Sequence, residues 1–429
     1  MIMDRFIIEG GYPLQGTVTP SGNKNAALPI LAATLLTDQE VVIRNLPQIK
    51  DVETMVEILA HLGVEIHKLG DKELALRARN VRSTEIDPQL TRSIRASILL
   101  SGPLLARCGG ISLPPPGGDV IGRRRVDTHL VALRSLGAQI DVGSRYEMRT
   151  TGLVGREIFL DEASVTATEN ALMAACLAKG TTIIRNAASE PHVQDLARFL
   201  NRLGGKISGL GSNALVVEGV DRLHGGEYEI EPDHIEVGSF IACAAITGGE
   251  LLIKNGQPEH LKMILLVFRR LGIEVEIRGN DLFVPHHGSL KLVADAHGAI
   301  PKIDDAPWPG FPADLMSVAI VVATQAEGTV LFFEKLYESR MFFVDKLIAM
   351  GARLILCDPH RVVVVGPARL HGQVMESPDI RAGMALVVAS LCAEGQSVIK
   401  NIGQIDRGYE RIDEKLRAIG ARIERVEDQ

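Results

Sequence analysis

The chain has 429 residues, which is more than one hydrophobic core usually serves, so two domains are expected. Hydrophobic residues make up 46% of the chain, a share typical of a globular protein and not of a disordered one. The net charge of −7 gives no support for nucleic-acid binding. The longest apolar runs, residues 27–36 and 384–393, are shorter than the roughly 18 residues of a membrane span.

The cysteines and the N-terminus indicate a compartment. The five cysteines form no CxxC pair, and Cys176, Cys243 and Cys392 lie in short apolar runs that predict buried free thiols. Free thiols are typical of a reducing compartment. Residues 1–11 lack the parts of a signal peptide. These features predict a cytoplasmic protein with no membrane contact.

In chain order, the same set of elements recurs six times. Each repeat opens with a helix of small apolar residues, such as 27–36, which is apolar on all sides and therefore predicted to be buried. A strand follows, and in four repeats it ends in Asn, at Asn45, Asn186, Asn255 and Asn401. Next comes an amphipathic helix; in the first repeat, residues 52–62 follow the i, i+3, i+4, i+7 rule.

A glycine ends each amphipathic helix, and two short strands complete the repeat. The spacing between successive glycines is 67 to 79 residues, and the positions are Gly63, Gly137, Gly204, Gly272, Gly351 and Gly420. Glycine at this place supplies the left-handed conformation that terminates a helix. A unit of about 70 residues cannot bury its apolar helix alone, so the six repeats predict two domains of three repeats each.

The second repeat departs from this pattern at residues 113–129, LPPPGGDVIGRRRVDTH. The prolines and glycines exclude a plain helix or strand, Asp119 follows them, and three arginines come next. Such a segment favours a mobile loop that closes over an anionic ligand, because functional loops are the exceptions on a repeated scaffold. The alternative is an exposed turn with a run of charges.

Several buried helices begin with a cation. Lys24, Arg95 and Arg381 lie in first turns, where a positive charge opposes the helix dipole. A bound anion would reverse that cost, because backbone N–H groups and the cation would act together. These starts predict a binding site for a phosphate or carboxylate ligand. The alternative for neighbouring Ser, Thr and Asp residues is ordinary N-capping.

Two further sites give weaker signals. Arg407 suits bidentate binding of a carboxylate or phosphate, or else it is a surface arginine paired with Asp406 or Glu410. His286 and His287 lack the spacing of metal ligands and are predicted to form a surface turn. No metal site is expected.

Five stretches of the sequence carry a resemblance to a known family: SGNKNAALPIL, RSIRAS, PGGDVIGRRRVDTH, PADLM and IDRGYERI. They resemble the enolpyruvyl transferases, in particular the branch that acts on UDP-N-acetylglucosamine, and the likeness covers nearly the whole chain. The resemblance implies an α/β fold of two inside-out α/β barrel domains, or α/β prisms, each with pseudo-threefold symmetry. It implies one domain at residues 24–231 and a second formed by residues 1–23 and 232–429.

The resemblance also implies a reaction. The 3-hydroxyl of UDP-N-acetylglucosamine would add to C2 of phosphoenolpyruvate, and phosphate would leave, which is the first committed step of peptidoglycan synthesis. The substrates would be the only partners, with no cofactor, no metal and no obligate protein partner.

Residue roles follow from the same resemblance. It implies that Asp119 is the acid for C3, that Asp314 is the base for the sugar hydroxyl, and that Asp379 lies beside the reacting centre. Lys24, Arg124 and Arg407 match contacts to phosphoenolpyruvate, and Lys24 and Arg407 are also expected to be catalytic. The expected substrate-binding set further includes Asn25, Arg95, Val126, Asp127, His129, Ser164, Val165, Thr166, Asp314, Leu336, Arg340 and Arg381.

The loop differs from the family pattern. Asp119 stands where most members carry Cys, two prolines are extra, and Arg125 stands where Pro is usual. An exposed Asp has a pKa near 3.9. For it to act as an acid at neutral pH, its pKa must be raised by the exclusion of water or by a nearby negative charge. Two alternatives stay open: a transferase acting on shikimate 3-phosphate, and a non-catalytic regulator that binds a UDP-sugar.

Overall fold

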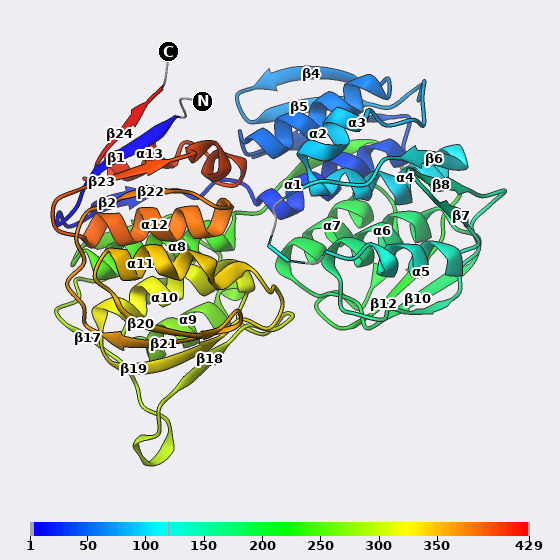
Figure 1. Ribbon diagram of the computed structural model, residues 1–429. Coiled ribbons are helices and arrows are strands. Elements are labelled where there is room, and N and C mark those ends of the chain that lie inside the picture. The colour runs from blue at the N-terminus through cyan, green and yellow to red at the C-terminus, as the bar shows by residue number, and fades with distance from the viewer. Residues whose placement is uncertain (1–3, 119–120, 123, 428–429) are drawn as a thin grey trace. The chain divides into compact units, whose positions relative to one another are not determined.

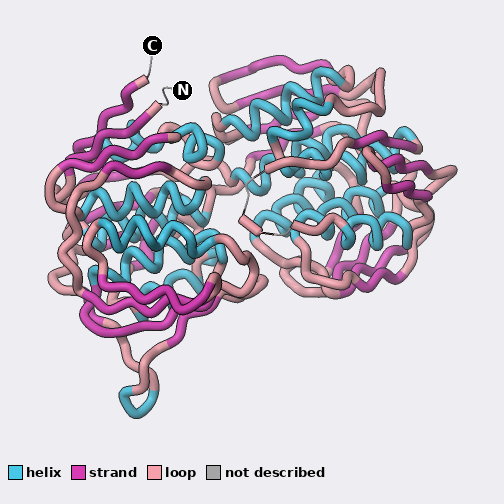
Figure 2. Tube along the Cα trace, viewed as in Figure 1, coloured by secondary structure: helices cyan, strands magenta, loops and turns pink. Residues whose placement is uncertain are grey.

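The computed structural model describes residues 4–118, 121–122 and 124–427 (Figures 1 and 2). Within them the chain forms two compact units, each with its own hydrophobic core. Unit 1 holds residues 4–21, 121–122 and 232–427, and unit 2 holds residues 22–118 and 124–231. None of the helices in the described residues combines the length and apolarity of a membrane span.

Unit 2 contains three repeats. Its elements are α1 (Lys24–Ala33), η1 (Thr34–Leu36), β3 (Glu40–Arg44), α2 (Lys50–His61), β4 (Glu65–Gly70), β5 (Glu73–Arg77), α3 (Pro88–Ser93), η2 (Arg95–Leu100), α4 (Ser101–Cys108), β6 (Gly110–Leu113), α5 (Asp127–Ser135), β7 (Gln139–Val142), β8 (Tyr146–Arg149), β9 (Glu157–Phe159), α6 (Val165–Cys176), β10 (Thr181–Arg185), α7 (Pro191–Arg202), β11 (Lys206–Ser208), β12 (Ala214–Glu218) and β13 (Gly226–Glu229).

Unit 1 contains the other three repeats. Its elements are β1 (Arg5–Glu9), β2 (Gln15–Val18), α8 (His234–Ile246), β14 (Glu250–Ile253), η3 (Pro258–His260), α9 (Lys262–Arg270), β15 (Glu276–Arg278), β16 (Asp281–Val284), β17 (Leu290–Lys291), η4 (Ala296–Gly298), β18 (Lys302–Asp304), η5 (Ala313–Leu315), α10 (Met316–Gln325), β19 (Ala326–Phe333), η6 (Arg340–Phe343), α11 (Val344–Ala349), β20 (Arg353–Asp358), β21 (Arg361–Gly366), β22 (Val374–Glu376), α12 (Ile380–Cys392), β23 (Gln396–Lys400), η7 (Ile402–Arg407), α13 (Ile412–Ala418) and β24 (Arg422–Val426).

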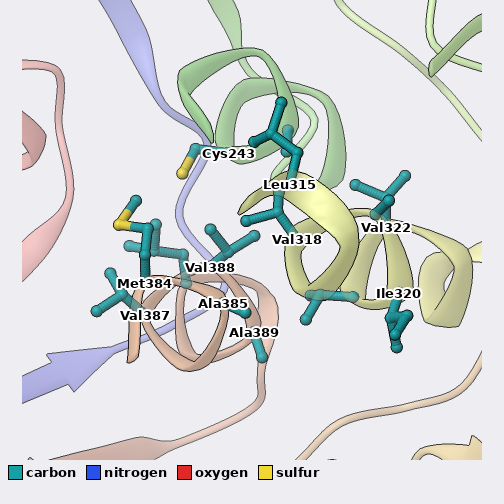
Figure 3. Close-up of a cluster of buried hydrophobic side chains, with 14 of the residues drawn as sticks. Cys243, Leu315, Val318, Ile320, Val322, Met384, Ala385, Val387, Val388 and Ala389 are labelled. Carbon is teal, nitrogen blue, oxygen red and sulfur yellow. The ribbon is translucent and has the colours of Figure 1, made fainter. Parts of the chain in front are cut away.

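In each unit the apolar helices lie inside and the sheets lie outside. In unit 1, α8, α10 and α12 pack against one another, and side chains such as Val318, Val322 and Val388 fill the space between them (Figure 3). These helices carry small apolar residues on every face, so only a central position removes them from water. In unit 2, α1, α4 and α6 form the corresponding centre. The predicted α/β fold with inside-out domains is confirmed.

The sheets of both units share one plan. Two antiparallel strand pairs form the main ladder, and in most sheets a short strand from another repeat adds in parallel at the edge. The first repeat shows this: β3 pairs antiparallel with β5, with Val41 opposite Leu76, and parallel with β13, with Val41 opposite Gly226. The parallel strand ties each repeat to its neighbour, which is why three repeats close into one unit.

The recurring glycines and asparagines both mark left-handed backbone. All six predicted glycines have positive φ, from 89° at Gly272 to 105° at Gly351, as the helix-ending role requires. The four strand-ending asparagines also have positive φ, from 49° at Asn255 to 57° at Asn401. Asn tolerates this conformation better than other residues with a Cβ. The repeat therefore uses two left-handed turns, of which the sequence predicted one.

Two local predictions need correction. The apolar helix expected in the second repeat is split into η2 and α4, because Pro103 lacks the N–H that would bond to Leu99 and so prevents a continuous α-helix. The five cysteines are free thiols, and Cys176 and Cys243 are buried, but Cys392 at the end of α12 is only partly buried.

Candidate active site

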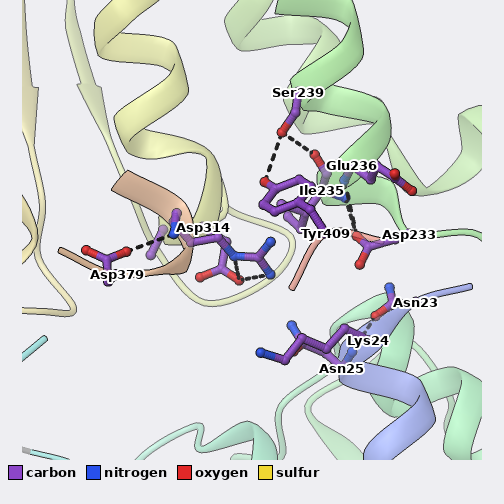
Figure 4. Close-up of polar contacts among 12 residues, drawn as sticks. Asn23, Lys24, Asn25, Asp233, Ile235, Glu236, Ser239, Asp314, Asp379 and Tyr409 are labelled. Atoms are coloured by element: carbon purple, nitrogen blue, oxygen red, sulfur yellow. Dashed lines mark hydrogen bonds and ion pairs between the residues drawn. The ribbon is translucent and has the colours of Figure 1, made fainter. Parts of the chain in front are cut away.

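In unit 1, Asp314 lies between two arginines. It occupies η5, just before α10, and is labelled in Figure 4. Its carboxylate accepts hydrogen bonds from Arg340 at 2.8 Å and from Arg381 at 3.0 Å. Arg340 comes from η6 and also donates to the carbonyl of Ala313 at 3.1 Å. Arg381 opens α12. Three segments of the unit thus supply one compact ion cluster.

The arginines decide the ionisation of Asp314. Burial alone would raise its pKa, but the charges of Arg381 and Arg340 and their hydrogen bonds outweigh burial and hold the pKa well below the ordinary value. The side chain is 24% exposed, so it stays accessible to a ligand. Both guanidiniums are buried and their pKa values are raised, because the charge of Asp314 more than offsets their burial.

Asp379 is the N-cap of α12. Its Oδ1 accepts the backbone N–H groups of Arg381 at 2.8 Å and Ala382 at 3.0 Å (Figure 4), as the N-cap expectation predicted. Its negative charge also acts on Arg340, so Asp379 belongs to the same electrostatic group as Asp314. The Arg381 guanidinium lies 5.4 Å from the ring centre of Tyr409, a buried residue that the sequence did not single out.

The remaining predicted residues of unit 1 lie on two other segments. Leu336 follows β19, with 43% of its surface exposed, and its backbone N–H donates to Asp305 at 3.3 Å. Arg407 ends η7, and its Nη1 donates to Gln404 at 3.0 Å. Its neighbour Asp406 accepts two hydrogen bonds from Arg425.

In unit 2, Lys24 is the first residue of α1. Asn23 caps the helix by accepting the N–H groups of Asn25 and Ala26 at 2.8 and 3.2 Å. The Lys24 ammonium lies 2.8 Å from Asp51 of α2, and both side chains are buried. The sequence missed Asp51, which offsets the cost of a cation in the first turn. Asn25 is partly buried and adjoins Lys24 (Figure 4).

Arg95 binds the backbone of the loop. Its Nη2 donates to the carbonyls of Arg124 at 2.7 Å and Arg125 at 3.0 Å. Gly118 has a φ of +107°, and a Cβ there would come within 2.8 Å of the Cβ of Arg95. Arg124 is partly buried, and its Nη1 would lie 3.4 Å from a Cβ added at Gly118. The loop therefore packs closely against the start of η2.

Salt bridges surround the start of α5. The exposed Arg125 contacts Asp127 and Asp161, each at 3.2 Å, and Thr128 donates to Asp161 at 2.7 Å. Asp127, the first residue of α5, is exposed, and Val126 precedes it without a side-chain cap. Asp161 was missed because no local pattern joins it to a loop more than thirty residues earlier.

His129 is held as a neutral imidazole. It is 1% exposed; burial and the charge of Arg95 lower its pKa to about 3. Nδ1 accepts from the amide of Asn170 at 2.8 Å, so Nε2 carries the proton and donates to Thr166 at 3.1 Å. Asn170 accepts the N–H of Gly102, which fixes the amide orientation. His129 therefore fixes the position of the Thr166 hydroxyl through this hydrogen bond.

Thr166 lies in the first turn of α6. Ser164 caps this helix, with its hydroxyl accepting from Ala167 at 3.4 Å, and Val165 is the first helical residue. Free backbone N–H groups at such a start favour a phosphate or carboxylate.

Residues 119 and 123 lie outside the described residues, so the acid predicted at Asp119 has no structural account. His286 and His287 contact backbone groups of Gly248 and Glu274.

Sequence comparison now gives the family. Residues 8–416 match the family described as EPSP synthase (3-phosphoshikimate 1-carboxyvinyltransferase). UDP-N-acetylglucosamine 1-carboxyvinyltransferase of Bradyrhizobium diazoefficiens is 56% identical over 425 residues, which cover 99% of each chain. The enzymes of the same name from Treponema denticola and Borreliella burgdorferi are each 54% identical, over 98% and 100% of this chain and 99% and 100% of their own. The chain belongs to the UDP-N-acetylglucosamine 1-carboxyvinyltransferase family.

Solved structures of enolpyruvyl transferases share the fold. The enolpyruvyl transferase NikO from Streptomyces tendae has a TM-score of 0.87 at 24% identity, with 100% of both chains covered. An EPSP synthase from Acinetobacter baumannii has a TM-score of 0.75 at 18% identity, covering 99% of this chain and all of its own. The six-repeat plan is thus common to the UDP-N-acetylglucosamine 1-carboxyvinyltransferase family and to more distant enolpyruvyl transferases.

Proposed function

We propose that this protein transfers the enolpyruvyl group of phosphoenolpyruvate to the 3-hydroxyl of UDP-N-acetylglucosamine and releases phosphate. The observation that carries the proposal is the 56% identity, over 99% of both chains, to an enzyme of that name. The clustered Asp314, Arg340 and Arg381 supply polar groups suited to a hydroxyl and an anion. The same reaction would place the protein at the first committed step of peptidoglycan synthesis.

In unit 1, we assign Asp314 to the sugar hydroxyl. Its carboxylate is ionised and partly exposed, so it can accept a hydrogen bond from that hydroxyl. A carboxylate held at such a low pKa is a weak base, so proton removal requires that Arg340 or Arg381 turn towards the substrate during the reaction. Asp379 adds negative charge near Arg340, Arg407 binds phosphoenolpyruvate, and Leu336 lines the sugar pocket.

In unit 2, we assign the helix starts and the loop to the anionic groups. Lys24 and Arg124 bind phosphoenolpyruvate, and Asn25 binds the amino sugar. The first turn of α6 binds the diphosphate through its backbone N–H groups. The residues that we assign to the uridine diphosphate are Arg124, Val126, Asp127, His129, Ser164, Val165 and Thr166, and we assign Arg95 to the binding site as a further arginine. Arg95 and His129 act by holding the loop backbone and Thr166.

Asp119 is the proposed acid that protonates C3 of phosphoenolpyruvate. The family resemblance implies that Cys is usual at this position, and a carboxyl and a thiol reach the acid form from opposite directions. A thiol near 8.5 begins protonated, whereas a carboxyl near 3.9 must have its pKa raised by the ligand's negative charge and by exclusion of water.

The acceptor is tested by measuring phosphate release from phosphoenolpyruvate with each candidate sugar. We expect release with UDP-N-acetylglucosamine and none above background with shikimate 3-phosphate, because the relatives that are 50–56% identical carry the former name. Release with shikimate 3-phosphate alone would transfer the assignment to the alternative enzyme. Calorimetric binding of UDP-N-acetylglucosamine without phosphate release would support a non-catalytic role.

A further inference from the structure

The residue that follows the central strand of a sheet makes the same hydrogen bond in several repeats. In three repeats it is an asparagine whose Nδ2 donates to the carbonyl of the residue that follows the parallel edge strand: Asn45 to Ile230 at 2.9 Å, Asn186 to Leu160 at 2.9 Å and Asn401 to Ser377 at 3.0 Å. The acceptor's own N–H returns a hydrogen bond to the residue before the asparagine: Ile230 to Arg44, Leu160 to Arg185 and Ser377 to Lys400. In these three repeats the position therefore carries a side-chain donor.

The fifth repeat has Glu334 at this position. β18 and β19 are parallel, with Asp304 opposite Phe333, so Asp305 and Glu334 are the next pair in register. The N–H of Asp305 donates to the carbonyl of Phe333 at 3.4 Å, which repeats the return bond seen in the other sheets. Glu334 thus replaces the asparagine, and Asp305 replaces its partner. An ionised carboxylate cannot donate a hydrogen bond.

Both carboxyl groups are removed from water. Glu334 and Asp305 are each 0% exposed. The Asp305 carboxylate accepts the N–H groups of Lys335 at 2.5 Å and Leu336 at 3.3 Å. No N–H or O–H group of a described residue lies in hydrogen-bonding geometry with either oxygen of Glu334.

Few charges surround the Glu334 carboxyl. Asp305 faces it directly, and the Arg340 guanidinium and the backbone of Tyr337 lie nearby. On the β20–β21 turn, His360 contacts only the backbone of Glu334. Two carboxylates this close, without water, cannot both be ionised.

We propose that Glu334 is a protonated carboxylic acid that donates to Asp305, and that this carboxyl pair holds residues 334–340 in place. Glu334 is then a positioning residue that donates, as an acid, to the side chain of Asp305, whereas Asn in three other repeats donates to the backbone carbonyl of the corresponding residue. Burial, the hydrogen bond to Asp305 and the charge of Asp305 raise the pKa of Glu334 to about 9. The proton therefore stays bound at neutral pH and leaves in mildly alkaline solution.

The held segment carries several groups assigned to the site. Leu336 is tied through its N–H to Asp305, and Arg340 binds Asp314. The N–H of Ser339 donates at 3.2 Å to the carbonyl of Ile121, which belongs to the loop of the second repeat. Ionisation of Glu334 would place two negative charges side by side and push this segment away.

The catalytic consequence rests on the proposed function. Above pH 9 the KM for UDP-N-acetylglucosamine should rise severalfold, because Leu336 and Arg340 shift. The KM for phosphoenolpyruvate should change less, because Lys24 and Arg407 lie on other segments and, of the residues assigned to it, only Arg124 lies on the loop that Ser339 contacts. Glu334→Gln should remove the alkaline rise, since an amide donates to Asp305 without ionising.

A test that needs no substrate is the pH dependence of stability. Between its ordinary range and about 9, folded Glu334 keeps a proton that the unfolded chain has lost. Wild-type stability therefore falls as pH rises through this window, with the unfolding constant growing by up to about tenfold per pH unit. The Glu334→Gln variant lacks this contribution to the pH dependence of stability, because its amide does not ionise. Its melting temperature should overtake that of the wild type, and the gap should widen from pH 6 to pH 9.

A matched control is Glu327→Gln, which removes the same charge from an exposed position on β19. Its melting curve should run parallel to that of the wild type at every pH. In a second variant, Asp305→Asn, the like charge is absent, so the alkaline loss of stability should be smaller than in the wild type. Parallel curves for Glu334→Gln and wild type, or an undiminished loss in Asp305→Asn, would overturn the proposal.

The two proposals fail separately. Divergent melting curves without phosphate release would leave the carboxyl pair standing and remove the transferase assignment. Phosphate release with parallel melting curves, and a KM for UDP-N-acetylglucosamine that rises equally in wild type and Glu334→Gln, would remove the carboxyl pair alone.

Discussion

In unit 1 the proposed site residues Asp314, Arg340 and Arg381 bind one another, whereas in unit 2 Arg95 binds the backbone of the loop and Lys24 pairs with Asp51, a residue outside the proposed site. Asp314 is held by Arg340 and Arg381, so two guanidiniums share one carboxylate and the three groups together carry one net positive charge. In unit 2, Arg95 donates through Nη2 to two carbonyl groups of the loop. His129 is neutral and positions a hydroxyl. The unit 1 set is therefore organised by its own ion cluster, and the unit 2 set by hydrogen bonds and by an ion pair with a residue outside the set.

The largest expected effect on turnover comes from substitution of Asp119, the proposed acid, which is not among the residues that form the ion cluster of unit 1 or the contacts described in unit 2. Asp119→Ala should lower kcat by about 10³-fold, because general-acid catalysis contributes roughly 10²–10⁴-fold. Binding of UDP-N-acetylglucosamine, measured by calorimetry, should change little. Unchanged turnover would remove Asp119 from the mechanism.

Asp119→Cys is the matched variant. It should retain turnover and become sensitive to an epoxide that alkylates thiols, such as fosfomycin. The wild type should resist, because a carboxylate is a weaker nucleophile than a thiolate. Stoichiometric inactivation of the wild type, with the adduct found on residue 119 by mass spectrometry, would contradict this.

Substitution of Asp314 tests most directly whether the ion cluster of unit 1 is organised before a ligand binds. Asp314→Asn should lower kcat by about 10²-fold through loss of the hydroxyl acceptor. It should also destabilise the fold by about 3 kcal/mol, since two buried guanidiniums would lose their anion. Asp345→Asn, at an exposed acid of α11, is the control for the change in charge. Chemical denaturation of both variants checks the difference; equal stability would mean that the ion cluster is not preorganised.

A smaller effect is expected at His129, where the sign of the pH dependence is informative. The folded pKa is about 3, so between pH 6.5 and pH 3 the unfolded chain binds a proton that the folded protein does not. Stability should therefore fall as the pH drops through this range. His129→Gln should show a shallower fall, and the exposed His61→Gln should match the wild type. Melting temperatures from pH 7 to pH 4 measure the slopes.

The repeated scaffold could be predicted because its signals are local. Gly63 and its counterparts need a left-handed conformation, and the wholly apolar helices need a buried position, wherever the rest of the chain lies. The N-cap at Asp379 is local in the same sense. In the second repeat, the effect of Pro103 on the helix was equally local but was not recognised.

The partners within the site could not be predicted, because they depend on register and tertiary packing. Lys24 meets Asp51 across two helices, and Arg125 meets Asp161 more than thirty residues away. The pairing of Glu334 with Asp305 follows only from the parallel register of β18 and β19. Sequence patterns identify which residues are chemically suitable, whereas the fold decides which of them neutralise one another.

The most direct measurement is the stoichiometry of the reaction of the purified protein with phosphoenolpyruvate and UDP-N-acetylglucosamine. The account predicts one phosphate released per sugar nucleotide consumed, with an enolpyruvyl ether on the 3-oxygen of the sugar in the NMR spectrum. Phosphoenolpyruvate that stays intact in the presence of bound UDP-N-acetylglucosamine would contradict the account.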